Sequence, residues 1–222
     1  MNPEIRKVFE TKRKIFDSIR EFMKSRDFLE VETPILQPVY GGTNARPFSS
    51  ELNALKMKVY MRISNEMYLK RLVVGGYEKI FEFSTDFRNE GIDRYHNPEF
   101  TQVETMWAYA DYKDNMKFAE EMISHVTKKI YGKTKVKIQG NELDFKTPWK
   151  RLRFLDAIKN ETKIDFSKVK NLAEAKKIAG KLEIDISKCN TVGEIMICIF
   201  EEKVQPKILQ PTLVYDYPLE AA

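Results

Sequence analysis

The sequence is poor in the residues that build metal centres and disulfide frameworks. Its 222 residues include two cysteines and two histidines, and the spacing of Cys189 and Cys198 matches no metal-ligand or redox motif. No apolar run is long enough to cross a bilayer, and the charged N-terminus lacks the apolar core of a secretory signal. We therefore expect no metal site within the chain, no membrane segment, and a cytoplasmic protein with reduced thiols.

Two widespread nucleotide-binding motifs are also missing. The chain contains no GxxxxGK[ST] phosphate loop and no GxGxxG segment after a strand, so a nucleotide would have to bind in another way. Hydrophobic residues make up 42% of the chain and charged residues 32%, which is typical of a globular domain. The net charge of +5 fits a nucleic-acid or nucleotide partner without identifying one.

Hydrophobic periodicity predicts a mixture of helices and strands in the first 131 residues. Apolar residues at helical spacing predict an N-terminal helix that begins near Pro3 and ends near residues 25–27. Further helices are expected over residues 65–76 and 114–131, with Asp114 as the cap of the second. Strands are expected over residues 28–36, 54–63, 79–90 and 100–110, with a glycine-containing loop over residues 38–48.

The character of the sequence changes after residue 150. Residues 151–204 contain several short, lysine-rich helical segments, and we expect them to form a helical insertion within the domain. Residues 209–218 return to strand character. The chain is therefore predicted to be of the α/β (α+β) class, with an antiparallel sheet flanked by helices.

The densest group of chemically active side chains lies in residues 87–106, FRNEGIDRYHNPEFTQVETM. If the two strands pair as an antiparallel hairpin, Arg88, Glu90, Phe100 and Glu104 share one face, because alternate residues of a strand do so. Guanidinium groups bind phosphate, aromatic rings stack on bases, and carboxylates bind amines. The pattern indicates a site for a nucleotide and an amine. The alternative is a solvated surface ion pair, worth less than about 1 kcal/mol, and periodicity alone favours neither.

The same segment, extended to other parts of the chain, resembles a known family. FRNEGIDRYHNPEF is similar to motif 2 of the class II aminoacyl-tRNA synthetases, in particular of their lysyl branch. Four further segments match that branch. FLEVETPILQPVYGGTNARPF resembles the motif 1 strand with its loop, and MRISNEMYLKRLVVGGYEKIFE resembles the substrate-binding helix with the next strand. The other two are AYADYKDNM and PKILQPTLVYDYP. The resemblance implies that residues 1–222 form part of a class II catalytic domain.

The resemblance assigns six residues to ATP. They are Arg88, Asn89, Glu90, His96, Asn97 and Phe100. Arg88 is implied to be the catalytic residue, which binds the α-phosphate and stabilises the charge that develops as the lysine carboxylate attacks. Glu90 is implied to bind near the adenine amino group, and Phe100 to stack on adenine. His96 and Asn97 are implied to reach the outer phosphates or the ribose.

A second group is implied to bind lysine. Glu66 and Glu104 would hold its ammonium groups, and Gly42 would let the loop backbone approach the substrate. Met106 stands where many lysyl enzymes have a tyrosine, and methionine fills that volume without donating a hydrogen bond. Asn65 replaces the proline that is usual at the start of the family's helix.

The resemblance also implies the reaction and the partners. Lysine and ATP would form lysyl-adenylate, the lysyl group would pass to tRNA, and a homodimer would form through the N-terminal helix and the motif 1 strand. Mg²⁺ is expected for the family, with its ligands beyond these 222 residues. Compared with the family pattern, the sequence lacks the glycine-rich motif 3 and the N-terminal anticodon-binding domain. Two alternatives stay open: a related enzyme that attaches a lysine-like acid to a protein, and a non-catalytic fragment that binds a nucleotide or a partner.

Overall fold

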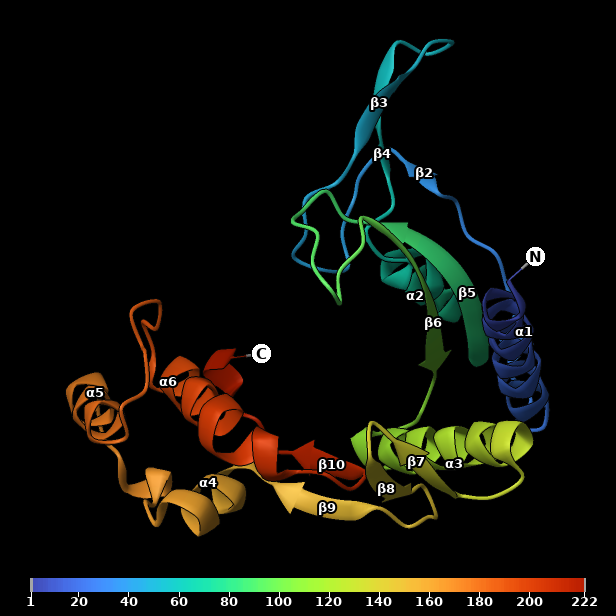
Figure 1. Ribbon diagram of the computed structural model, residues 1–222. Helices are drawn as coiled ribbons and strands as arrows, with labels where there is room; N and C mark the ends of the chain where they lie inside the picture. The colour runs from blue at the N-terminus through green and yellow to red at the C-terminus, as the bar shows by residue number, and fades with distance from the viewer. Residues whose placement is uncertain (1, 222) are drawn as a thin grey trace. The chain divides into compact units, whose positions relative to one another are not determined.

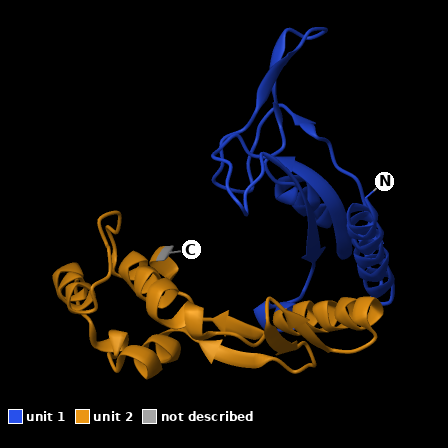
Figure 2. Cartoon of the chain, in the orientation of Figure 1, with its two compact units in different colours: residues 1–115 blue, residues 116–222 orange. Residues whose placement is uncertain are grey.

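The computed structural model describes residues 2–221 and divides into two compact units, residues 1–115 and residues 116–222 (Figure 2). Unit 1 contains α1 (Pro3–Lys24), β1 (Leu29–Glu30), β2 (Leu36–Gln37), β3 (Ser49–Leu52), β4 (Met57–Met61), α2 (Glu66–Val74), β5 (Lys79–Phe87) and β6 (Glu99–Trp107). Within residues 2–221, no helix combines the length and the apolar character that a membrane span requires.

One of the two three-stranded sheets of unit 1 has the strand order β1-β5-β6, and its strands β5 and β6 are labelled in Figure 1. β5 and β6 pair antiparallel from Lys79 opposite Trp107 to Phe87 opposite Glu99, which confirms the predicted hairpin. β1 pairs with β5 in the parallel direction, so the prediction of an entirely antiparallel sheet is wrong at this edge. The chain is a mixed α/β protein with antiparallel sheets and helices, as predicted at that coarser level.

Helix α1 covers one face of this sheet. The side chain of Asn2 accepts a hydrogen bond from the backbone N–H of Glu4, and Pro3 follows directly, so the helix begins as its sequence predicts. The ring of Phe16 stacks on that of Phe83 of β5, with 4.7 Å between the ring centroids. Since neighbouring residues of a strand point to opposite faces, this packing leaves the even-numbered residues of β5 and β6 for the other face.

Two strand predictions in unit 1 need correction. Residues 28–36 form only the short strands β1 and β2, and Pro34 between them has no N–H to donate to a ladder. Strand β3 was not predicted, because all four of its residues are exposed and give no apolar alternation. It pairs antiparallel with β4, which lies inside the predicted strand 54–63.

Unit 2 begins within α3 and continues through two small sheets and a group of helices. Its elements are α3 (Tyr112–Tyr131), β7 (Lys135–Ile138), β8 (Asn141–Asp144), β9 (Lys150–Arg153), α4 (Phe154–Thr162), η1 (Phe166–Lys168), α5 (Leu172–Lys181), α6 (Val192–Ile199), η2 (Phe200–Val204), η3 (Gln205–Lys207), β10 (Thr212–Tyr215) and η4 (Leu219–Ala221).

The cap of α3 differs from the predicted one. Asp111 accepts hydrogen bonds from the backbone N–H groups of Lys113 and Asp114, at 2.7 and 3.1 Å. Asp114 in turn accepts one from the backbone N–H of Asp111 at 3.0 Å. Asp111 is therefore the capping residue, and Asp114 closes the capping arrangement from inside the first turn.

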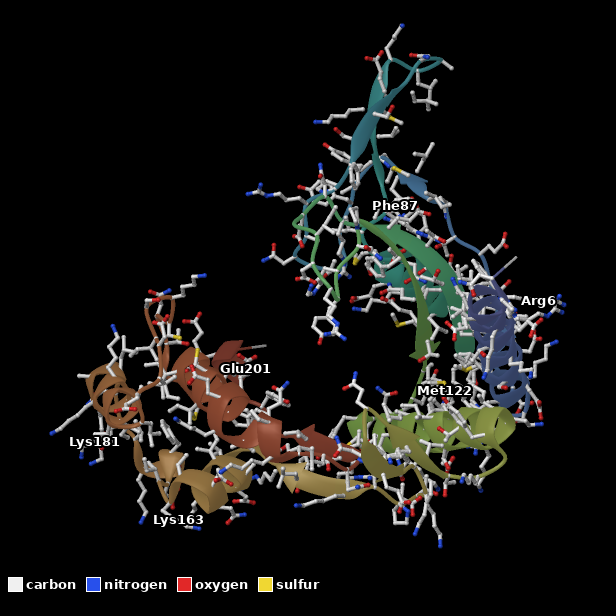
Figure 3. All side chains as sticks on the ribbon, in the orientation of Figure 1. Arg6, Phe87, Met122, Lys163, Lys181 and Glu201 are labelled. Carbon is white, nitrogen blue, oxygen red and sulfur yellow. The ribbon has the colours of Figure 1, made fainter. Side chains whose placement is uncertain are left out.

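The helices after β9 have a core of their own. Phe154 is fully buried and stacks on Phe200, with ring centroids 4.9 Å apart. Lys163 and Lys181 lie on the outside of this segment (Figure 3). The chain then returns as β10 and pairs in parallel with β9, so the helical segment is an excursion between two neighbouring strands. That it is an insertion within a catalytic domain stays a prediction.

Both cysteines belong to this helical core. Their Sγ atoms lie 3.0 Å apart, and both residues are free thiols. Burial raises the pKa of Cys198 to about 11, and the contact with Cys189 adds to the rise. The thiol of Cys198 therefore stays neutral, and both cysteine side chains pack within the helical core.

Candidate functional site

A pocket of about 290 Å³ lies where the β5–β6 hairpin opens into its connecting loop. It is lined by Arg88, Glu90, Gly91, Tyr95, His96, Asn97 and Phe100. Five of the six residues that were predicted to bind ATP are therefore gathered around one hollow. Asn89 is not among the lining residues, and its backbone N–H donates a hydrogen bond to the carbonyl of Arg46 at 2.7 Å.

The pocket residues do not occupy the predicted strand positions. β5 ends at Phe87, which is labelled in Figure 3, so Arg88 and Glu90 lie beyond the strand instead of on its face. Arg88 still meets Phe100, because its Cζ lies 4.9 Å from the centre of the ring. Its Nε also donates to the carbonyl of Ile63 at 3.3 Å. A planar cation and a flat ring thus stand together at the edge of the pocket.

The connecting loop is ordered by its own side chains. Asp93 accepts hydrogen bonds from the backbone N–H groups of Tyr95 and His96, at 2.7 and 2.9 Å. The imidazole Nδ1 of His96 lies 2.8 Å from the other carboxylate oxygen of Asp93. The bond from the Tyr95 N–H, followed by that from the His96 side chain, lowers the pKa of Asp93. Local contacts therefore fix the place of His96 in the loop.

The residues predicted to bind the amine meet around Ser64. Its hydroxyl donates to Glu104 at 3.4 Å and accepts from the backbone N–H of Glu66 at 3.1 Å. Gly42 has a φ of +93°, and a Cβ at this position would stand 2.9 Å from the Ser64 hydroxyl oxygen. Only glycine allows the loop to approach the start of α2 this closely. Met106 lies two residues beyond Glu104 on the same face of β6, opposite Ile80.

A buried ionic network beneath this group was not predicted from the sequence. Arg62 is 4% exposed, and its guanidinium lies 2.7 Å from a carboxylate oxygen of Glu82 and 3.1 Å from one of Asp86. Glu82 also accepts hydrogen bonds from the hydroxyl of Thr33 at 2.8 Å and from the side chain of Asn65 at 3.0 Å. A buried charge is tolerated when it is paired and hydrogen-bonded in this way.

A signal for this network was present in the pattern of β5. Phe81, Phe83, Thr85 and Phe87 lie on one face of the strand, and Glu82, Ser84 and Asp86 lie on the other. One face of an otherwise apolar strand therefore carries carboxylates. By the same alternation, Gln102 shares the face of Phe100 and Glu104. The partner Arg62 could not be found in this way, because its contacts depend on how distant segments pack.

The electrostatics of the site follow from burial. Burial raises the pKa of Asp86, and the charge of Arg62 opposes that rise. Burial also raises the pKa of Glu104, and the charges of Asp86 and Glu66 raise it further. The Oε2 atom of Glu104 is buried and accepts no hydrogen bond from any described residue. Glu104 therefore offers a carboxylate oxygen with which a cationic ligand can form an ion pair.

The two groups together provide two kinds of recognition. The pocket carries a guanidinium and an aromatic ring, which suit a phosphate and a base. The neighbouring acidic group suits an ammonium ion. Among the residues that the structure describes, no three histidine, cysteine, aspartate or glutamate side chains are placed to hold a metal ion. The arrangement fits a nucleotide and an amine held side by side.

Comparison with known proteins agrees with this description. The family model for tRNA synthetases class II (D, K and N) matches residues 1–222. The lysine–tRNA ligase of Clostridium novyi (strain NT) is 49% identical over 224 residues, which cover 99% of this chain and 44% of that protein. The lysine–tRNA ligase of Carboxydothermus hydrogenoformans is 47% identical over 222 residues, which cover 100% of this chain and 46% of that protein. The chain thus spans less than half the length of these curated relatives.

The buried network generates a prediction about stability. Replacing Arg62 by methionine should lower the free energy of unfolding of unit 1 at pH 7 by about 3–5 kcal/mol, because Glu82 and Asp86 lose their counter-ion. The loss should be greatest above the raised pKa of Asp86 and shrink as the pH falls through it, since a protonated carboxyl needs no counter-ion. Urea titrations followed by Trp107 fluorescence, with Trp149 replaced by phenylalanine, measure the change.

The matched control is Lys56→Met between β3 and β4, where the lysine side chain is 80% exposed and pairs with Glu51. This control should cost less than about 1 kcal/mol. Equal costs for the two variants, or a deficit at Arg62 that does not change with pH, would contradict the account given for the network.

Proposed function

Because the chain belongs to the class II tRNA synthetases of the D, K and N group, we propose that residues 1–222 form part of the catalytic domain of a lysine–tRNA ligase. The observation that carries the proposal is the placement of two groups in unit 1. A pocket with Arg88 and Phe100 adjoins an acidic group that ends in the unpaired oxygen of Glu104. The first group suits ATP and the second suits the ammonium groups of lysine.

ATP is proposed to bind in the pocket at the open end of the hairpin. The adenine ring stacks on Phe100, whose face already accepts the flat guanidinium of Arg88 at 4.9 Å. Arg88 then pairs with the α-phosphate, for which its fork of donors is suited. Glu90, His96 and Asn97 line the same pocket and contact the adenine amino group, the ribose or the outer phosphates.

Lysine is proposed to bind at the acidic group. Its ammonium groups pair with the carboxylates of Glu104 and Glu66. Ser64 bonds to the carboxylate of Glu104 and to the backbone N–H of Glu66, while the carboxylate of Glu66 pairs with Lys70 until the substrate ammonium takes its place. Gly42 lets the backbone of the preceding loop come close to the substrate, since no Cβ fits there. Met106 lies on the same face of β6 as Glu104 and has no hydrogen-bond donor. We therefore expect Met106 to contact the lysine side chain through van der Waals interactions alone.

The chemistry proposed for the site is positioning and charge neutralisation. The lysine carboxylate attacks the α-phosphorus of ATP, the bond between that phosphorus and the bridging oxygen breaks, and pyrophosphate leaves with the electron pair. No protein side chain forms a covalent bond. Arg88 stabilises the charge that builds on the phosphoryl oxygens, and the two binding groups hold the reactants in line. A ribose hydroxyl of tRNA then attacks the carbonyl carbon of lysyl-adenylate, an ester forms, the anhydride bond to the phosphate breaks, and AMP leaves.

Mg²⁺ is the metal expected for such a reaction, where it neutralises phosphate charge. The part of the chain that the structure describes has no cluster of three ligands for it, and we assign it no residue here. The cytoplasm, where tRNA is aminoacylated, is the proposed location.

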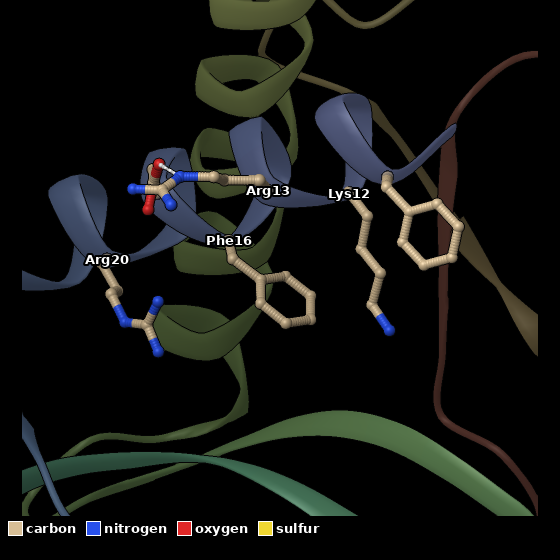
Figure 4. Close-up of a pocket in the computed structure, with 6 residues that line it drawn as sticks. Lys12, Arg13, Phe16 and Arg20 are labelled. Carbon is tan, nitrogen blue, oxygen red and sulfur yellow. Dashed lines mark hydrogen bonds and ion pairs between the residues drawn. The ribbon is translucent and has the colours of Figure 1, made fainter. Parts of the chain in front are cut away.

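We also propose a homodimer through α1. Three large apolar side chains of this helix are strongly exposed: Ile5 by 57%, Val8 by 66% and Phe9 by 69%. A hollow of about 350 Å³ beside them is lined by Phe9 together with Lys12, Arg13, Phe16, Asp17 and Arg20, and Figure 4 shows how Lys12, Phe16 and Arg20 project around it. An exposed apolar helix face of this kind is typical of an interface.

The role of Arg88 can be tested by its replacement with alanine. We expect the dissociation constant for ATP to rise at least tenfold and lysine-dependent pyrophosphate exchange to fall by about 100-fold or more, because a phosphate-binding cation is lost. Calorimetry and exchange assays measure the two effects. Arg94→Ala is the matched control, since Arg94 lies in the same loop with its guanidinium over Tyr95. Equal behaviour of the two variants would exclude Arg88 from the site.

The two carboxylates predict selectivity between the ligands. Glu66→Gln and Glu104→Gln should each weaken lysine binding by about tenfold or more and leave ATP binding within about twofold, because each removes a charge that pairs with an ammonium group. Calorimetric titrations with both ligands, and with shorter and longer diamino acids, measure this. Glu99→Gln, an exposed position at the start of β6, is the control. Parallel losses for lysine and ATP would contradict the assignment.

The dimer proposal predicts the effect of a charge on α1. Phe9→Glu should weaken self-association by at least tenfold, because a carboxylate would be buried against an apolar surface. Lys14→Glu, at another exposed position of the same helix, should change it little. Sedimentation velocity over a range of concentrations measures the association. A wild-type chain that stays monomeric at 100-fold above the concentration used for the assays would overturn the proposal.

A further inference from the structure

Gln102 connects two carboxylates that carry separate roles. Its side-chain nitrogen lies 2.5 Å from Oδ2 of Asp86 and 2.9 Å from Oε1 of Glu104. A primary amide has two N–H donors, and these two acids lie nearer to them than a third acceptor, Oδ1 of Asn65 at 3.5 Å. Gln102 lies between Phe100 and Glu104 on the same face of β6, and is half-buried. The amide therefore ties the acidic group of the site to β5.

The other end of this connection is the buried arginine. Asp86 is fully buried, and its Oδ1 lies 3.1 Å from Nε of Arg62. Arg62 also donates to the backbone carbonyls of Thr85 and Thr33, each at 3.0 Å, so its position is fixed from several sides. A continuous path of contacts thus leads from Arg62 through Asp86 and Gln102 to Glu104.

From this geometry we propose that Gln102 is a positioning residue for substrate binding. Its amide is oriented by Asp86 and holds Glu104 by Oε1, which leaves Oε2 of Glu104 as the acceptor for the ammonium group of the substrate. The role rests on the proposed function for the identity of the ammonium ligand, and on the described contacts alone for the hold on Glu104. No role for Gln102 was predicted from the sequence.

The charges around Glu104 explain why it needs such a hold. Glu82 lies directly opposite it in the β5–β6 ladder, and like charges at such positions repel. Burial raises the pKa of Glu104, and the charges of Asp86 on β5 and Glu66 at the start of α2 raise it further, whereas the cations Arg62 and Arg88 act on Asp86. A carboxyl that keeps its proton is a poor partner for an ammonium ion, so these effects oppose substrate binding.

Two donors oppose that tendency, and they are unequal. Ser64 reaches Oε1 of Glu104 at 3.4 Å, whereas Gln102 reaches the same atom at 2.9 Å. The hydrogen bonds from Ser64 and from Gln102 both favour the ionised form of Glu104 and lower its pKa, against the effect of burial. Both donors use the same oxygen, and Oε2 accepts no hydrogen bond from the described residues. Gln102, the nearer of the two donors, therefore helps to keep Glu104 ionised and to leave Oε2 as the oxygen that receives the substrate.

The test compares the 222-residue chain with its Gln102→Met variant, which keeps the side-chain length and removes both donors. Glutamate labelled with ¹³C at the carboxyl carbon reports the pKa of Glu104 by NMR, with the signal assigned through Glu104→Gln. We expect the pKa of Glu104 to rise by about one unit in the variant. Lysine affinity at pH 7 should fall several-fold and its pH profile should shift upward by the same amount. Thr101→Val, the neighbouring residue on the opposite face of β6, should change neither quantity.

The readouts separate this inference from the proposed function. An unchanged pKa of Glu104 in a folded Gln102→Met variant would overturn the inference, whatever the chain binds. If the pKa of Glu104 rises in the variant but the wild-type chain binds no lysine, the role of Gln102 in orienting Glu104 stands and the proposed ligand is overturned. If the variant does not fold, the side-chain amide protons of Gln102 in the wild-type chain decide: they should shift with the titration of Glu104, and amide signals that ignore pH would reject the role.

Discussion

The buried guanidinium of Arg62 is the interaction on which the rest of unit 1 depends. It lies between Glu82 and Asp86 of β5, and it also reaches the backbone of Thr33. Removing three charged groups from water is costly, and the cost is offset only because nearly every polar atom has a partner. One network therefore fixes three segments relative to one another: the segment that follows β1, the end of β4, and β5. Apolar packing has no preferred direction and would not define their orientation as closely.

This constraint reaches the site through short steps. Asn65, the residue before α2, donates to Glu82, so the start of the helix is held over the same strand. Glu66 follows at once, and Gly42 closes against Ser64 and Glu66 from the preceding loop. The acidic group is thus held in place by contacts that lead back to the buried network beneath it. The pocket around Arg88 differs, since its loop is ordered by Asp93 through local hydrogen bonds among exposed residues.

Periodicity and motif resemblance predicted those parts of the fold that depend on local sequence. The β5–β6 hairpin follows from alternation, and α2 ends at Gly75 as its sequence indicates. The site residues Arg88 and Phe100 were expected on one strand face; they meet although Arg88 lies beyond the strand, because the chain turns back at Pro98 and pairs there. The parallel pairing of β1 and the role of Arg62 were not predictable, since both depend on contacts between segments far apart in the sequence.

The two halves of the site differ in how much they would have to rearrange when a ligand binds. The acidic group is held in place by its contacts, so little of the binding free energy of an amine is spent on ordering the protein. The pocket around Arg88 would have to rearrange, because the guanidinium of Arg88 lies on the ring of Phe100 that the base of a nucleotide would cover. Binding of the nucleotide therefore has to move one side chain from an aromatic face to a phosphate. The guanidinium gains charge pairing as it leaves the ring, and this exchange places the cation at the phosphorus only when a nucleotide is present.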